Sequence, residues 1–215
     1  MSQATKYSLK NDIALVLAVA AARFQLADHK SVDTDDGACW RATLVHNRTK
    51  IVTVSNGGHG GPDQSHYHAT TDAGKAADKI SLEKLFAVPE VAAVVRGNLR
   101  FDLDLKKEYD NVSEADYQAA KADIEAHVPV PTDESLERFV DHLAHATKFA
   151  RKIERLIKTR LVFVFQGDDA KGGYASIAIA DTPSNRDRVR QAQKRPIDYF
   201  MADVFNATKQ PSAAQ

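Results

Sequence analysis

Three histidines and an aspartate cluster around a glycine-rich stretch in the first third of the chain. His59 lies inside residues 55–65, which read SNGGHGGPDQS, and Asp63, His66 and His68 follow. Two histidines two positions apart on an extended segment point to the same side. A third histidine from the loop could complete a three-histidine metal site that keeps an open water position. The pattern is therefore compatible with one enzymatic function, that of a metal-dependent hydrolase that binds zinc or manganese at these histidines.

The same residues also fit a site without any metal. The histidines could bond the loop backbone or contact a ligand or partner together with Tyr67, and they match no metalloenzyme signature. Gly60-Gly61 runs into Pro62-Asp63 instead of the Gly-Lys-Ser/Thr of a nucleotide-binding loop, which leaves only a generic anion nest. We assign no catalytic residue and expect no cofactor outside the hydrolase alternative. The candidate binding residues in this region are His59, Asp63, His66, Tyr67 and His68.

A second group of candidate residues is basic and lies in the last third of the chain. Lysines and arginines recur at helical spacing within residues 148–158 and again within residues 186–195. Residues four apart share one side of a helix, so each segment could present two arginines to a phosphate-bearing partner. A solvated helix face would show the same pattern. The candidate contacts to nucleic acid or to an acidic protein are Arg151, Arg155, Arg186 and Arg190.

Charge and composition narrow the class of protein. The 215 residues carry 29 Lys and Arg against 29 Asp and Glu, but residues 136–215 hold 14 against 9, a balance of +5. This basic C-terminal part suits a phosphate or an acidic partner, or simply attracts the acidic part of the same fold. The single cysteine, Cys39, excludes a disulfide framework and favours a reducing compartment, so we expect a cytoplasmic protein. The apolar run at residues 13–22 is too short to span a membrane, which takes about 20 residues.

The elements that must position these residues are mostly helices. Apolar residues spaced three and four apart predict a long helix from Thr132 or Asp133 to about Lys158. This spacing also fits a coiled-coil homodimer, although packing within the chain is preferred. Further helices are predicted over residues 13–22, with Asn11 or Asp12 as cap, and over residues 81–88 and 184–195. A helix is also predicted over residues 113–127, which open with Ser113 and Asp116 in capping-box positions. The apolar positions of the long helix are Leu136, Phe139, Leu143, Ala146, Ala150, Ile153 and Ile157.

Alternating side chains predict the strands. Residues 39–46 and 50–55 form a hairpin through Asn47-Arg48, and residues 160–166 pair with residues 174–180. The strict alternation of residues 99–105 predicts an edge strand. Residues 26–37 are expected to be a polar loop, and residues 196–205 a final turn or helix.

These elements predict an α+β fold. It has an N-terminal β-hairpin unit with a helix, an acidic middle, and a long amphipathic helix packed on a C-terminal two-stranded element. A rigid Pro129-Val130-Pro131 connector divides residues 1–128, the α+β part with the glycine-rich loop, from residues 129–215, the basic part. Both parts could also belong to one compact domain.

Two blocks of the chain resemble uncharacterised proteins from phages, plasmids and bacterial genomes. The resemblance rests on Trp40-Arg41-Ala42-Thr43-Leu44, on residues 55–61 with Tyr67-His68, and on Arg160-Leu161-Val162-Phe163 after a basic helix. Asn47-Arg48 departs from the Asp-Gly expected at the hairpin turn. The resemblance implies a mobile-genetic-element context and carries no known activity or site residue.

The expected function is therefore a non-enzymatic binding protein. It would act as a phage or mobile-element accessory factor that inhibits or modulates host defence or nucleic-acid machinery. Its partner would be a host or phage protein, or nucleic acid bound through the basic C-terminal part, with no membrane contact. The metal-dependent hydrolase is the alternative.

Overall fold

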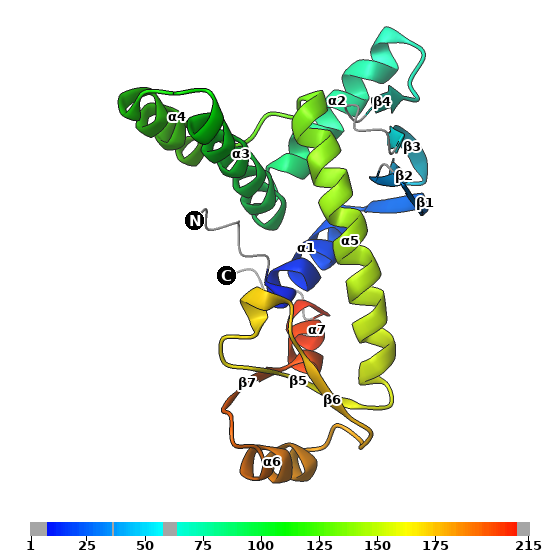
Figure 1. The fold of residues 1–215 in the computed structure, drawn as a ribbon. Coiled ribbons are helices and arrows are strands. Elements are labelled where there is room, and N and C mark those ends of the chain that lie inside the picture. The colour runs from blue at the N-terminus through cyan, green and yellow to red at the C-terminus, as the bar shows by residue number, and fades with distance from the viewer. Residues whose placement is uncertain (1–7, 36, 58–63, 210–215) are drawn as a thin grey trace, which may run out of the picture. The chain divides into compact units, whose positions relative to one another are not determined.

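The computed structural model describes residues 8–35, 37–57 and 64–209 and has the predicted α+β fold (Figure 1). Within these residues it contains seven α-helices and two antiparallel sheets. The chain divides into two compact units. Unit 1 contains Ala18–Ala144, and unit 2 combines Lys6–Leu17 with His145–Gln215. The boundary predicted after residue 128 stays a prediction.

Unit 1 contains a four-stranded sheet in the order β1-β2-β3-β4. The strands are β1 (Phe24–Thr34), β2 (Gly37–His46), β3 (Thr49–Gly57) and β4 (Gln64–Tyr67). The predicted hairpin is confirmed: Asn47 and Arg48 have φ angles of 49° and 69°, the left-handed pair that a two-residue turn of type I′ requires.

The prediction of a loop over residues 26–37 is wrong, because most of this segment belongs to β1. This strand is polar because it is an edge strand that pairs only with β2. Most of its described side chains are exposed, so the strand carries little of the apolar alternation by which strands are recognised.

The helices of unit 1 are α2 (Asp72–Phe86), α3 (Pro89–Tyr109), α4 (Glu114–Ala126) and the first half of α5 (Asp133–Ile157). Ser113 caps α4 as predicted, since its Oγ accepts a hydrogen bond from the amide of Asp116 at 3.1 Å. The edge strand predicted over residues 99–105 is wrong, because α3 runs through the whole segment. Tyr117 of α4 donates to Asp104 of α3 at 2.7 Å. Because α4 packs against α3, the apolar residues of α3 are spread over a wide face. In the sequence this spread resembles the apolar alternation of a strand.

Helix α5 is confirmed at almost the predicted bounds and contributes to both units. Six of its seven stripe residues are buried, and Ile157 is half-buried. In unit 1 the ring of Phe139 meets that of Phe86 edge to face, with centroids 5.5 Å apart. In unit 2 Ala150 and Ile153 enter the core. The stripe is thus covered by residues of its own chain.

Unit 2 is built from both ends of the chain. It contains α1 (Leu9–Ala21) up to Leu17, the second half of α5, and the strands β5 (Leu161–Phe165), β6 (Ala175–Ile177) and β7 (Ile197–Phe200) in the order β6-β5-β7. A short 3-10 turn η1 (Asp169–Lys171), α6 (Pro183–Ala192) and α7 (Met201–Lys209) complete it.

The predicted strand pair of unit 2 is confirmed, whereas β7 was expected to be a turn or helix. Helix α1 begins earlier than predicted: Ser8 Oγ accepts from the amide of Asn11 at 3.0 Å, so neither Asn11 nor Asp12 is its cap. The core contains Leu9 and Ile13 of α1 beside residues of α5, β5 and α7. Among the described residues, no helix is both long and apolar enough to cross a membrane.

Candidate functional site

His66 and His68 lie at strand β4, on the same side, with ring centroids 5.3 Å apart in an edge-to-face arrangement. His68 Nε2 is 2.8 Å from Thr53 Oγ1, which is 2.8 Å from Thr43 Oγ1. Burial lowers the pKa of His68, and the nearby His66 and Lys50 lower it further, against the opposing carboxylate of Asp78. The neutral imidazole, the form that also binds metals, is therefore favoured at His68.

His59 and Asp63 lie outside the described residues. Over the part of the chain that the structure describes, no group of three or more His, Cys, Asp or Glu side chains is placed to hold a metal ion. A three-histidine site at His59, His66 and His68 therefore stays a prediction, as does the zinc or manganese that it would bind.

Tyr67 and Ser65 of β4 point to the opposite side from the histidines and contact α5. The Tyr67 hydroxyl donates to Asp133 Oδ1 at 2.7 Å, and Ser65 Oγ donates to Glu137 Oε1 at 2.9 Å. Burial and the Asp133 carboxylate raise the pKa of Tyr67, so its hydroxyl remains a donor. These bonds fasten β4 to the start of α5. Tyr67 as a residue is still 39% exposed. Any contact with a partner would use this accessible part.

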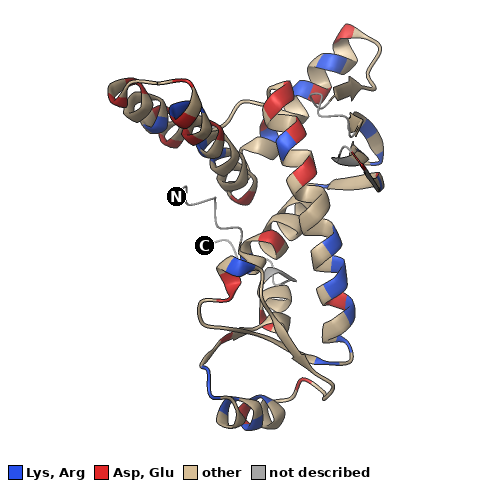
Figure 2. Cartoon of the chain, viewed as in Figure 1, with Lys and Arg blue, Asp and Glu red and all other residues tan. Residues whose placement is uncertain are grey.

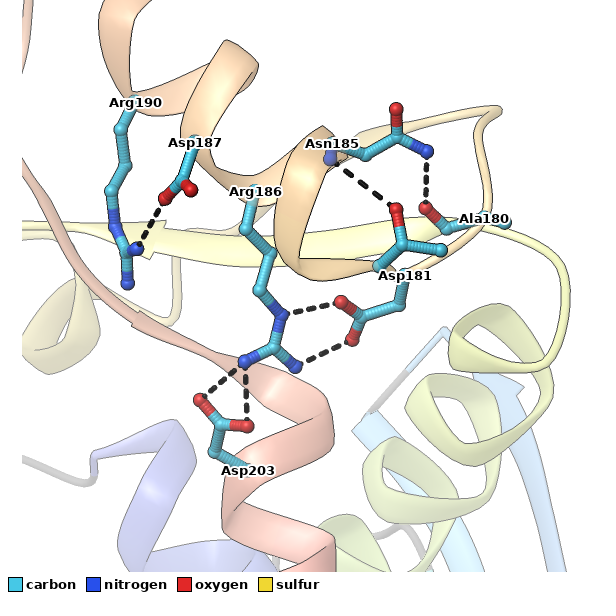
Figure 3. A network of polar contacts seen from close by, with 8 residues as sticks. Ala180, Asp181, Asn185, Arg186, Asp187, Arg190 and Asp203 are labelled. Carbon is cyan, nitrogen blue, oxygen red and sulfur yellow. Dashed lines mark hydrogen bonds and ion pairs between the residues drawn. The ribbon is translucent and has the colours of Figure 1, made fainter.

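The basic segment of α6 is held by carboxylates of unit 2 (Figure 3). Arg186 donates through Nε and Nη2 to both oxygens of Asp181, and through Nη1 to Asp203 at 2.8 and 3.0 Å. Its guanidinium also lies 4.6 Å from the ring centroid of Phe200. Arg190 lies over the same ring at 4.9 Å and is 3.3 Å from Asp187. The structure thus gives Arg186 an internal role that its spacing did not indicate.

The basic segment of α5 is arranged differently. Figure 2 shows Lys and Arg gathered along its C-terminal half, interrupted by one acidic position. Lys152 Nζ lies 5.4 Å from the ring centroid of Tyr174. Arg151 and Arg155 have no ion pair or hydrogen bond among the described residues, and Glu154 between them is exposed. We call this exposed set the α5 basic face: Lys148, Arg151, Lys152, Arg155 and Lys158.

Two further cations were missed by the sequence reasoning. Lys30 of β1 and Arg41 of β2 lie directly opposite each other in the strand register. Their proximity could not be expected while residues 26–37 were taken for a loop. The only signal for a strand there was a few apolar residues at even spacing in a polar sequence: Phe24, Leu26 and Val32.

Cations without a carboxylate partner among the described residues include Lys30 with Arg41 in unit 1 and the α5 basic face in unit 2. Known proteins add nothing to this picture: comparison with protein families, with curated proteins and with solved structures found no match. The function has to be inferred from the residues of this chain and their geometry.

Proposed function

We propose that the chain is a non-enzymatic binding protein that contacts the phosphate backbone of duplex nucleic acid through the α5 basic face. The observation that carries the proposal is a row of four exposed cations on one side of α5, followed by exposed Lys158 directly after the helix end; among the described residues, Arg151 and Arg155 have no carboxylate partner. An unpaired cation that neutralises a phosphate releases a counterion and so gains affinity.

The dimensions of the face support this partner. From Lys148 to Ile157, the residue before Lys158, the helix rises by about 14 Å at about 1.5 Å per residue. A major groove is about 12 Å wide, so the row of cations can reach phosphates on both sides of a groove. Lysine and arginine contacts to phosphate position a protein without reading sequence, and binding with little sequence preference is expected.

In this proposal the protein works in the cytoplasm as an accessory factor of a phage or another mobile element. It would modulate host defence or nucleic-acid machinery in a stoichiometric way. The support is the basic face together with the resemblance to mobile-element proteins. An acidic surface on a host or phage protein is the alternative partner, because it offers the same charge complementarity.

The test is the salt dependence of binding to random duplex DNA. For the wild type, log affinity should fall linearly with log salt. The variant Arg151→Glu/Arg155→Glu should bind more weakly, with a slope shallower by about 1.8 if each arginine neutralises one phosphate. Its free energy of unfolding should change by less than about 0.5 kcal/mol, because both side chains are exposed and unpaired.

A control is Lys75→Glu/Lys79→Glu, which makes the same change of charge at the same spacing at two exposed positions of α2. Unlike the arginine variant, it also removes a long, exposed ion pair between Lys75 and Asp72 at 3.9 Å. This control should keep the wild-type slope. Equal losses in both variants would show a general charge effect and contradict the proposal. Absence of wild-type binding to duplex DNA at about 50 mM salt would also contradict it, since electrostatic binding is strongest at low salt.

The hydrolase alternative has its own test. A metal enzyme should carry near-stoichiometric zinc or manganese in elemental analysis, and His66→Ala should remove it. Metal-free protein that shows no thermal shift with added zinc or manganese would exclude this activity.

A further inference from the structure

A pocket of about 430 Å³ opens on one face of the unit 1 sheet. All four strands contribute to its lining, which includes the cations Lys30 and Arg41. The volume lies within the range of about 300–1,000 Å³ that is usual for small-molecule sites. The pocket belongs to a different unit from the α5 basic face, so a function of the pocket is independent of the function proposed above.

One row across the sheet consists of hydrogen-bond donors. Lys30 of β1 is opposite Arg41 of β2, Arg41 is opposite Ser55 of β3, and Ser55 is opposite Gln64 of β4. Residues directly opposite each other on neighbouring strands share one face, with strands about 4.8 Å apart. An ammonium, a guanidinium, a hydroxyl and an amide are thus lined up along the same edge of the pocket. We call these four residues the donor row.

The two cations of the donor row are costly for the sheet itself. Like charges directly opposite each other on adjacent strands are destabilising. The side chains of Lys30 and Arg41 make no ion pair or hydrogen bond with any residue that the structure describes. By contrast, Lys50 on β3 of the same sheet has a carboxylate partner, Asp28 of β1, at 3.4 Å. An unrelieved pair of cations beside a pocket is accounted for if an anion binds there.

The neighbouring row is apolar or small. Val32 is opposite Cys39, and Cys39 is opposite Gly57. These residues also line the pocket, as does Trp40 between the two rows on β2. Side chains two positions apart along a strand share a face, so the donor row and the apolar row lie side by side. A ligand that fills both must carry an anionic group and an apolar body.

We propose that this pocket binds a small organic phosphate, with the phosphate on the donor row and the organic body over Val32, Cys39 and Gly57. The charge selects phosphate over carboxylate. A phosphate ester carries a charge of about −1.5 to −2 at neutral pH, which two cations balance, whereas a carboxylate carries one negative charge. The arginine adds a planar fork that matches two phosphate oxygens.

The chain provides a direct reporter at the pocket in Cys39 and an indirect one in Trp40, because alternation along the strand directs the Trp40 side chain to the other face of the sheet. It has one tryptophan and one cysteine, and both Trp40 and Cys39 line the pocket. The experiment is a titration of the wild-type protein with phenyl phosphate, followed by Trp40 fluorescence, and in parallel by the rate at which a thiol reagent modifies Cys39. Phenyl phosphate should change the fluorescence in a saturable way and slow the modification. Inorganic phosphate, which lacks the apolar body, and benzoate, which lacks the second charge, should bind more weakly.

Two variants assign the effect to the donor row. Lys30→Gln and Arg41→Gln should each weaken phenyl phosphate binding about tenfold or more, the size expected for losing a charge-assisted hydrogen bond. Both should melt at the wild-type temperature or above, because each relieves the repulsion. Lys50→Gln is the control: it removes a cation of the same sheet outside the pocket and should leave binding unchanged.

Three results would overturn the proposal. The first is the absence of any saturable fluorescence change or Cys39 protection in the wild type up to about 10 mM phenyl phosphate, beyond the millimolar range of weak specific binding. The second is benzoate binding as tightly as phenyl phosphate. The third is lower melting temperatures in both glutamine variants, which would show that the cations serve the sheet. None of these results bears on the salt slope of DNA binding, so the two proposals fail separately.

Discussion

The arginines around the unit 2 sheet and the cations Lys30 and Arg41 of the unit 1 sheet have opposite surroundings. In unit 2 the arginines around the β6-β5-β7 sheet are engaged. Arg186 holds two carboxylates, Arg190 stacks on Phe200, and Arg195 lies 4.7 Å from the ring centroid of Phe165 while it donates to Asp168 at 2.8 Å. In the unit 1 sheet Lys30 and Arg41 have no such partners among the described residues.

This difference separates arginines that stabilise the fold from arginines available to a ligand. A basic side chain that already has a carboxylate gains little from a phosphate, and its loss leaves the carboxylate unpaired. A cation without a partner can be removed at little cost to stability. Stability and binding measurements on matched variants can therefore show whether a given basic residue stabilises the fold or is available to a ligand.

The largest effect should follow truncation in the aromatic layer on which the unit 2 arginines stack. Phe163 is 1% exposed, and its ring centroid is 5.3 Å from that of Phe165 and 6.2 Å from that of Phe200. Phe163→Ala should lower the free energy of unfolding by about 3–5 kcal/mol through lost burial and the remaining cavity. Chemical denaturation followed by circular dichroism measures this. A loss below about 1 kcal/mol would contradict the tight packing of this layer.

Arg186→Met should produce the next largest effect. The substitution leaves the Asp181 side chain, 15% exposed, without its guanidinium, next to Asp203. We expect a loss of about 2–3 kcal/mol, because a half-buried carboxylate loses charge-assisted bonds. Arg188→Met is the matched control on the same helix. Arg188 is exposed and has no partner among the residues described, so less than about 0.5 kcal/mol should be lost. Equal losses would remove the distinction between engaged and free arginines.

The smallest effect concerns the pH dependence of unit 1. Because the pKa of His68 is lowered in the folded protein, the unfolded chain takes up its proton more readily. The contribution of His68 to stability is complete above the ordinary pKa of 6.5 and is lost as the pH falls from 6.5 toward the folded pKa. His68→Gln should therefore flatten the decrease in melting temperature across this interval. Identical pH profiles of His68→Gln and the wild type would contradict the assignment.

The sequence predicted the elements whose signal is local. The apolar spacing of α5 and the cap at Ser113 are properties of neighbouring residues, and both are confirmed. Strand β1 was missed because an exposed edge strand has little apolar pattern. Residues 99–105 were misread because α3 packs on more than one side, which broadens its apolar face beyond a single stripe.

The candidate sites were less accessible to sequence reasoning, because they depend on pairs that are distant in sequence. Arg186 and Arg151 look alike as members of basic helices. What separates them is Asp203, 17 residues beyond Arg186, together with Asp181. The cross-strand pairing of Lys30 with Arg41 likewise depends on the register of β1 with β2. Spacing along the chain identified the right residue types and could not show which of them were already engaged.

The core of unit 2 also imposes an order on folding during synthesis. Leu9 and Ile13 pack with residues from Ala150 to Phe205, so these apolar side chains of α1 meet their partners only after the residues up to Phe205 have left the ribosome. Residues of unit 1 are made in between, and domains generally fold as they emerge. Throughout this interval the unit 2 side of α1 remains uncovered, as an apolar surface that chaperones can bind. Closing so long a loop is slow but costs little extra free energy. Helix α1 should therefore pack against α5, β5 and α7 in the last step of folding.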